Sequence, residues 1–158
     1  MCWIGDNKNE HIAIDDIKCK KILLKETIDN SFCYYSPIFN QIYKIGETYT
    51  SNPIIPKLYG NGPRVVIHEG IHCYDIKKTK AVITKDVFGK RNLVIYSIRW
   101  LTRKYKYRPL IGWGEYAVAV ECIIPKGTIY YENQNGEIVT QNLKIIRELK
   151  ENEYVLDK

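Results

Sequence analysis

The chain lacks several features that would assign it to a familiar class of protein. No apolar run in its 158 residues approaches the roughly 20 residues of a membrane-spanning helix. The N-terminus lacks the charged start and apolar core of a signal peptide. No glycine-rich phosphate loop, internal repeat or low-complexity linker is present. These absences predict one domain over residues 1–158, located in the cytoplasm and without a membrane partner.

Cysteine is present but follows no recognisable pattern. The five cysteines are odd in number, widely spaced and without a C-x-x-C pair: Cys2, Cys19, Cys33, Cys73 and Cys122. This distribution predicts reduced, mostly buried thiols and argues against a disulfide framework or a zinc ribbon. Removal of Met1 would expose Cys2 as an N-terminal nucleophile of the amidotransferase kind, but Trp3 stands where those enzymes have glycine. We therefore interpret Cys2 as a small buried residue.

Histidine is also scarce, and two of the three histidines fall in one short string, His68-Glu69-Gly70-Ile71-His72. The string has the form H-E-x-x-H, which is typical of zinc metallopeptidase helices. On a helix, positions i and i+4 share a face, so His68 and His72 would bind one zinc ion while Glu69 acted as general base. On a strand the two histidines would lie roughly 13 Å apart, too far to share an ion.

The residues around the string favour a strand. Val65-Val66-Ile67 is a β-branched run, and Gly70 costs a helix about 1 kcal/mol relative to alanine. No histidine follows His72 as a third ligand, which leaves a carboxylate, either Glu115 or Glu121, for that role. We therefore expect a strand through 65–74 and keep a zinc metallopeptidase, with zinc as its cofactor, as an alternative.

Apolar and turn patterns indicate strands along most of the chain. Strands are expected at 17–25, 31–35, 38–43, 116–124, 128–131, 137–140 and 143–149, with a hairpin turn at 133–136. Two helices are expected as well. Asp75 is a candidate N-cap for a helix over 76–84, and apolar residues within 92–106 have helical spacing. The expected class is α+β: a single, mostly antiparallel, strongly bent β-sheet with one or two helices.

Several short landmarks follow one another in a recognisable order. They are a G-x-x-Y turn at 46–49, the segment Gly70-Ile71-His72-Cys73-Tyr74 before a short helix, a strand and turn at 120–127, and a closing run at 141–149. In these landmarks the chain resembles an uncharacterised family of small domains common in bacteriophage and anaerobic-bacterial genomes. The resemblance implies a phage-type protein of the host cytoplasm or the virion. Its landmark includes His72 but not His68, which makes the first half of the H-E-x-x-H string incidental.

The order of elements also distantly resembles that of ADP-ribosyltransferase folds. Those enzymes carry a histidine or arginine on an early strand and a glutamate on a late one. The resemblance implies that His72, Tyr74 and Glu121 are the candidates for such roles here. No complete catalytic set is recognisable, so the resemblance supplies no established activity.

A stretch that alternates basic and aromatic residues is the second candidate site. Its members, with a tryptophan in the Gly-Trp-Gly loop that follows, are Arg99, Trp100, Arg103, Lys104, Tyr105, Lys106, Tyr107, Arg108 and Trp113. Arginine and lysine pair with phosphates, and aromatic rings stack on bases. The stretch carries much of the net charge of +6. The alternative is a solvated helix face whose aromatic side chains pack inward.

These features predict a small accessory or binding protein whose ligand is a nucleotide, a nucleic acid or another anion, without metal chemistry or a cofactor of its own. Enzymatic activity stays open only as a zinc metallopeptidase or an ADP-ribosyltransferase-like protein. A virion-associated structural protein, whose partner is another protein, is a further alternative.

Overall fold

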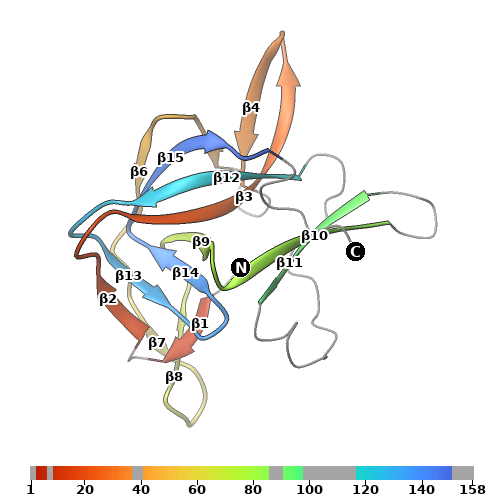
Figure 1. The fold of residues 1–158 in the computed structure, drawn as a ribbon. Helices are drawn as coiled ribbons and strands as arrows, with labels where there is room; N and C mark the ends of the chain where they lie inside the picture. The colour runs from red at the N-terminus through yellow and green to blue at the C-terminus, as the bar shows by residue number, and fades with distance from the viewer. Residues whose placement is uncertain (1–2, 7–8, 37–40, 86–90, 98–116, 151–158) are drawn as a thin grey trace.

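The computed structural model describes residues 3–6, 9–36, 41–85, 91–97 and 117–150. Within these residues the chain forms fifteen β-strands and no α-helix (Figure 1). No helix in this part of the chain is therefore long and apolar enough to cross a membrane.

Most strands belong to one large antiparallel sheet. In spatial order its members are β2 (Glu10–Ile12), β13 (Ile129–Glu132), β14 (Glu137–Thr140), β9 (Ile71–Asp75), β3 (Ile17–Ile28), β12 (Ala117–Ile124), β15 (Asn142–Glu148) and β6 (Thr48–Thr50). Two further strands extend it from the outer half of β3, namely β4 (Ser31–Tyr35) and β5 (Ile42–Tyr43). The pair β3–β12 lies near the middle and is in register from Ala117 opposite Leu24 to Ile124 opposite Ile17.

Two smaller antiparallel units complete the described fold. Three strands pair in the order β1 (Trp3–Asp6), β8 (Arg64–Ile67) and β7 (Lys57–Leu58). A separate hairpin consists of β10 (Thr79–Lys85) and β11 (Arg91–Ser97).

The expected α+β class is wrong, because neither expected helix is found. Residues 76–78 form a turn, β10 and β11 pair with each other, and residues 98–106 lie outside the described residues. Asp75 does cap backbone N–H groups, since its Oδ1 accepts hydrogen bonds from Lys77 (2.7 Å) and Lys78 (3.1 Å). A helix N-cap makes the same bonds. Here the β-branched run Val82-Ile83-Thr84 then pairs with β11, and the class is all-β.

Most expected strands are confirmed. The segment 17–25 lies inside β3, 31–35 coincides with β4, and 137–140 coincides with β14. The turn expected at 133–136 joins β13 to β14. Of the strand expected at 38–43, residues 42 and 43 form β5, and residues 38–40 lie outside the described residues.

The H-E-x-x-H string lies where the chain passes from one sheet to another. β8 ends at Ile67 in the three-stranded sheet, and β9 begins at Ile71 in the large sheet. Between them Gly70 has a φ of +94°, which favours glycine, and an added Cβ would lie 2.5 Å from Cγ2 of Val139. The expectation of one strand through 65–74 is therefore corrected to two strands and a bend.

The large sheet carries buried residues on both faces. One face holds the main core, which includes Leu23, Val120, Ile138, Leu143 and Ile145. The other face packs against the three-stranded sheet through a smaller cluster of Trp3, Val65, Ile67, Tyr131 and Val139. The main core is formed by strands of the large sheet itself and by Ala13, which follows β2, whereas the small sheet packs against the second face.

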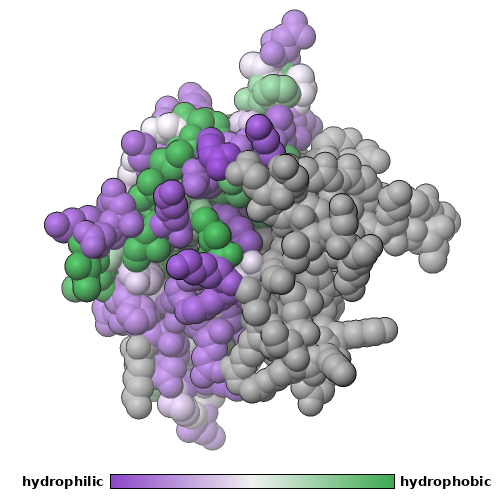
Figure 2. All heavy atoms as spheres, in the orientation of Figure 1, coloured by the Kyte–Doolittle hydropathy of each residue, from purple (hydrophilic) through white to green (hydrophobic). Residues whose placement is uncertain are grey.

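The β3–β4 hairpin projects from the body (Figure 1). Asp29 and Asn30, with φ of 50° and 64°, form its two-residue turn, as a primed hairpin turn requires. Figure 2 shows a hydrophilic tip with hydrophobic residues just below it. Ile28 and Phe32 are 51% and 61% exposed, and Nζ of Lys25 lies 3.9 Å from the ring centroid of Phe32.

Candidate functional site

A row of polar residues crosses the large sheet from strand to strand. Cross-strand pairing places Tyr74 between Glu137 and Lys20, and places Glu121 between Lys20 and Arg147. Directly paired residues of an antiparallel sheet point to the same face. These five side chains from β14, β9, β3, β12 and β15 therefore share one face, which is the face of the smaller core cluster.

Lys20 is the buried centre of this row. The residue is 5% exposed, and its Nζ donates a hydrogen bond of 3.0 Å to the carbonyl oxygen of Thr79. Burial lowers the pKa of Lys20 to about 8, and the nearby carboxylate of Asp75 opposes that shift. Lys20 therefore remains mostly protonated at neutral pH, but its proton is held less tightly than that of a solvated lysine.

The outer end of the row is an ion pair at the surface. Nε of Arg147 lies 3.1 Å from Oε2 of Glu121, and the two side chains are 46% and 17% exposed. Exposed pairs of this kind contribute about 0–1 kcal/mol to stability. Glu121 thus has a partner and is not an isolated carboxylate in a cleft.

The three transferase-like candidates share this face. Tyr74 and Glu121 lie on either side of Lys20, and His72 lies two residues before Tyr74 on β9, opposite Val139. The His72 side chain is half-buried, and its Nε2 has no hydrogen-bond partner among the described residues. Burial, with the nearby Lys21 ammonium, lowers the pKa of His72 to about 4. The imidazole is therefore neutral at physiological pH.

A cleft of about 470 Å³ lies at the inner end of the row, beside Glu137. Its walls come from β1, from the start of β8 and from the turn between β13 and β14. The lining residues are Ile4, Gly5, Asp6, Asn9, Pro63, Arg64, Asn133, Gln134, Asn135 and Glu137. Four of these ten residues carry side-chain amides, so hydrogen bonding dominates the chemistry of this cleft.

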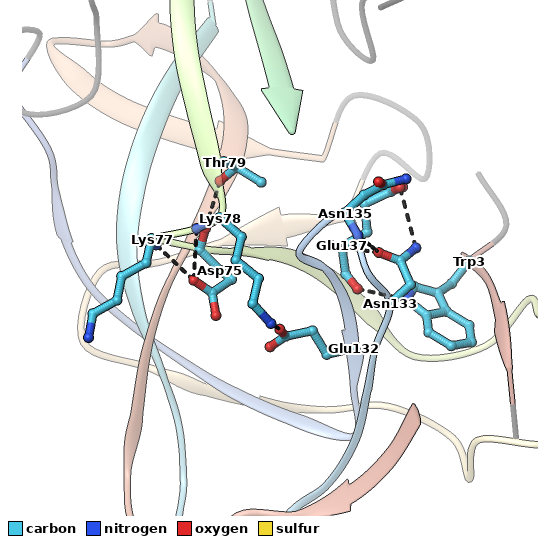
Figure 3. A network of polar contacts seen from close by, with 9 residues as sticks. All are labelled: Trp3, Asp75, Lys77, Lys78, Thr79, Glu132, Asn133, Asn135 and Glu137. Carbon is cyan, nitrogen blue, oxygen red and sulfur yellow. Dashed lines mark hydrogen bonds and ion pairs between the residues drawn. The ribbon is translucent and has the colours of Figure 1, made fainter. Parts of the chain in front are cut away.

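Asn133 holds the turn that forms one wall of the cleft (Figure 3). Its Oδ1 accepts hydrogen bonds from the backbone N–H groups of Asn135 (3.0 Å) and Glu137 (3.1 Å). Its Nδ2 donates to the carbonyl oxygen of Ile4 (3.1 Å) and to Oε1 of Glu137 (3.4 Å). Because both ends of this amide are engaged, Asn133 positions the wall of the cleft.

The carboxyl group of Glu137 joins the cleft to the row. Burial raises its pKa, and hydrogen bonds from the side chains of Asn133 and Asn135 oppose that shift. On the opposite wall Asp6 pairs in register with Arg64. The described lining therefore contains two carboxyl groups and one guanidinium, which does not favour a purely anionic ligand.

A second network lies on the other side of Gly136 (Figure 3). Nζ of Lys78 is paired with Oε2 of Glu132, and this contact raises the pKa of Lys78. The backbone N–H of Asp75 donates to the carbonyl oxygen of Gly136 at 2.8 Å, and a Cβ on Gly136 would lie 2.7 Å from Cβ of Lys78. The turn at 76–78 thus supports the turn that lines the cleft.

The proposed zinc ligands do not lie on a helix. His68, Glu69 and Gly70 occupy the bend between β8 and β9, and His72 is inside β9. Hydrogen bonds from its own backbone N–H and from that of Ile55 lower the pKa of Glu69, against a smaller opposing effect of burial. Among the described residues no group of three or more His, Cys, Asp or Glu side chains is arranged to hold a metal ion. The geometry that the metallopeptidase interpretation needs is therefore missing.

The basic and aromatic stretch is the second candidate site that the sequence predicts. All of residues 99–108, and Trp113, lie outside the described residues. Comparison of the chain with protein-family models, with curated proteins and with solved structures gives no match.

Sequence reasoning missed the residues that the structure brings together. Lys20 was visible as a lysine inside the apolar strand 17–25, but nothing in the sequence distinguished it from its neighbour Lys21. Residues 133–136 were interpreted only as a turn, although three amides next to Glu137 were a signal for a polar site.

Proposed function

We propose that the protein is a binding protein without catalytic activity and that its ligand is a nucleotide or a nucleotide unit of a nucleic acid. The observation that carries the proposal is the amide-rich cleft beside Glu137. A volume of about 470 Å³ falls within the usual range of roughly 300–1,000 Å³ for small-molecule sites.

The cleft suits the uncharged part of such a ligand. Amide side chains offer a donor and an acceptor side by side, which matches the edge of a nucleobase. Asn135 and Gln134 line the cleft from the turn, and Asn9, whose Oδ1 accepts a hydrogen bond of 2.7 Å from the backbone N–H of Asp6, lines it beside β1. The carboxyl groups of Asp6 and Glu137 can accept hydrogen bonds from base amino groups but would repel a phosphate.

The phosphates are assigned to the basic stretch at 99–108. That assignment rests on its alternation of basic and aromatic residues, since arginine and lysine neutralise phosphates and release counterions. The proposal therefore combines a base-reading cleft with a separate phosphate contact.

The face that carries His72, Tyr74 and Glu121 supports an enzyme less well. None of the three lines the cleft, Glu121 is paired with Arg147, and Tyr74 is buried. The binding function instead uses the cleft that the described residues line beside Glu137.

A pair of variants tests the cleft. Asn135→Ala removes one amide from it, whereas Asn52→Ala removes an amide from an exposed loop residue outside it. Isothermal titration with nucleosides, nucleotides and short oligonucleotides should show affinity reduced about 5- to 150-fold by the first change, because one lost base contact costs about 1–3 kcal/mol. The control should bind as the wild type does. Absence of binding to every one of these ligands would sink the proposal.

A second pair tests the phosphate contact. The double substitution Arg103→Ala/Lys104→Ala should weaken nucleotide binding equally for all bases and reduce the slope of log affinity against log salt by about 2. Lys77→Ala/Lys126→Ala removes the same charge from two exposed turn positions and should leave affinity unchanged apart from a small general effect. If only the Asn135 variant loses affinity, the ligand is an uncharged molecule. A stable oligomer with no nucleotide affinity would instead favour the virion-associated structural protein.

A further inference from the structure

Three thiols meet in the middle of the large sheet. Cys19 on β3, Cys73 on β9 and Cys122 on β12 are 0%, 1% and 0% exposed, and all three are free. They belong to the main core cluster and so lie on the face opposite to the polar row. Cys19 occupies the central strand of the three, and the nearness of both other thiols together with burial raises the pKa of the Cys19 thiol. Cys33, on β4, belongs to a different part of the sheet.

The pairing register distinguishes the two neighbours of Cys19. Cys122 lies directly opposite Cys19 in the β3–β12 pair. Directly opposite residues of antiparallel strands have Cα atoms about 4.5–5.5 Å apart, inside the range of about 4.4–6.8 Å that a disulfide requires. Asp75 is the residue opposite Cys19 on β9, so Cys73 is diagonal to it. Diagonal Cα atoms lie about 7–8 Å apart, outside that range.

The bond would join distant parts of the chain at the centre of the sheet. Residues 19 and 122 enclose most of the described fold between them, including β4 to β11. A cross-link that closes a loop of about 100 residues strongly restricts the unfolded chain. A register irregularity between β12 and β15 falls at Glu121 and Cys122, so the backbone next to this pair already departs from the regular ladder.

We propose that Cys19 and Cys122 form an oxidation site, at which a small oxidant converts the two buried thiols into a cross-strand disulfide while Cys73 stays reduced. This inference is independent of the nucleotide-binding proposal, since none of the three cysteines lines the cleft.

With hydrogen peroxide as the oxidant the step is balanced. One sulfur, as its thiolate, attacks a peroxide oxygen, the O–O bond breaks, and water leaves after protonation, which produces a sulfenic acid. The second thiol then attacks that sulfur, the S–S bond forms, and a second water molecule leaves. Two thiols lose two hydrogens in total, and one peroxide is reduced to two waters. Burial makes the reaction slow, since oxidant must enter by local opening of the sheet.

Peptide mapping of the whole chain tests the site directly. After treatment with hydrogen peroxide, alkylation and cleavage on the carboxyl side of acidic residues, Cys19 is in the peptide 17–26, Cys73 in 70–75 and Cys122 in 122–132. We expect a linked 17–26/122–132 species that is lighter by two hydrogens than the sum of its parts and that disappears on reduction. Cys73 should be recovered alkylated. A 17–26/70–75 link, or recovery of all three as alkylated thiols after the partly buried Cys33 has been oxidised, would overturn the proposal.

Thermal unfolding gives a second readout. The oxidised protein should unfold roughly 5–15 °C above the reduced protein, because the cross-link restricts the unfolded chain. Cys33→Ser should retain this shift and Cys122→Ala should lose it. If Cys122→Ala fails to fold, Cys73→Ala serves as the test, because it removes a thiol of the same cluster and should still retain both the linked peptide and the shift. Loss of the link in Cys73→Ala would contradict the assignment to Cys122.

Discussion

Trp3 donates a hydrogen bond of 2.8 Å from its indole Nε1 to the carbonyl oxygen of Glu137, 134 residues further along the chain. The indole is 1% exposed and packs edge-on against Tyr131, with ring centroids 5.7 Å apart. A Cβ on Gly5 would lie 2.6 Å from Cζ2 of the same ring, so glycine is needed there. The first strand is thus fastened to the wall of the cleft by one side chain.

Replacing Trp3 by phenylalanine should loosen this attachment without removing the aromatic packing. The carbonyl oxygen of Glu137 would lose its indole donor but keep the backbone N–H of Asn133 at 3.1 Å, and the loss of one such hydrogen bond costs about 0.5–1.5 kcal/mol. Urea unfolding should therefore show a free energy of unfolding lower by that amount, and ligand affinity should fall with it. Tyr59→Phe, at a residue 50% exposed, is the matched control and should change stability by less than about 0.5 kcal/mol. Equal stability of Trp3→Phe and wild type would contradict the role assigned to this bond.

The buried lysine of the polar row predicts a dependence of stability on alkaline pH. Burial lowers the pKa of Lys20 to about 8 in the folded protein, from 10.5 in a solvated chain. Between these values the unfolded chain binds the proton more tightly, so stability rises as pH increases from 8. Relative to Lys20→Met, the wild type should gain about 1–2 kcal/mol between pH 8 and 9.5, because one pKa unit corresponds to about 1.4 kcal/mol. The comparison cancels the other titrating groups, which both proteins share. A difference that stays constant with pH would refute this account.

The half-buried imidazole of His72 predicts a loss of stability at acidic pH. Its pKa is lowered from 6.5 to about 4, chiefly by burial, so the folded protein keeps the imidazole neutral where the unfolded chain protonates it. Stability is therefore lost as pH falls from 6.5 towards 4, by up to roughly 3 kcal/mol at the lower limit. His72→Gln should remove this part of the acid sensitivity.

Urea midpoints at pH 7.5 and pH 5 measure the His72 effect. Val139→Ala, at the residue opposite His72 on β14, is the control, because an apolar deletion should lower stability by the same amount at both values. The histidine interpretation fails if His72→Gln and wild type lose equal stability on acidification.

Local patterns predicted most of the strands, but they also predicted helices that the described residues do not form, and they did not predict the site. The run 17–25 is long and rich in apolar residues, and the turn at 133–136 contains Asn-Gly, so both could be located from the sequence. At Asp75 the capping signal was real, since its Oδ1 does bind two backbone N–H groups, but a turn and a helix begin with the same bonds. Only the pairing of β10 with β11 decides between a turn and a helix after Asp75, and the residues of β11 lie outside the short segment that shows the capping signal.

The candidate site depends on register between strands far apart in the chain. Tyr74 and Glu121 flank Lys20 because β9 and β12 pair with opposite edges of β3. Composition and periodicity carry no information about which residues of two distant strands are opposite each other. The same reason hid the direct pairing of Cys19 with Cys122. The expectation of mostly buried thiols holds for the described cysteines, since three of those four are buried.

Gly70 gives the sharpest test of what the H-E-x-x-H string is, because the two interpretations predict changes of opposite sign. In the bend, Gly70 has a φ of +94°, and an added Cβ would lie 2.5 Å from Cγ2 of Val139 and 3.4 Å from two side-chain atoms of Ile54. Gly70→Ala should therefore destabilise the protein by about 2 kcal/mol or more, from backbone strain and overpacking together. In a metal-binding helix the same change would stabilise by about 1 kcal/mol.

Gly62→Ala supplies the matched control for that measurement. Its position is open, with no heavy atom within 4 Å of an added Cβ, and its φ is not in the left-handed region. The control should change the free energy of unfolding by less than about 1 kcal/mol in either direction. If Gly70→Ala were as stable as Gly62→Ala or more stable, the bend between β8 and β9 would be wrong, and His68 and His72 would return to one face of a helix. If Gly70→Ala is clearly less stable than the control, the two histidines belong to different structural units, and their shared spacing is an accident of the sequence.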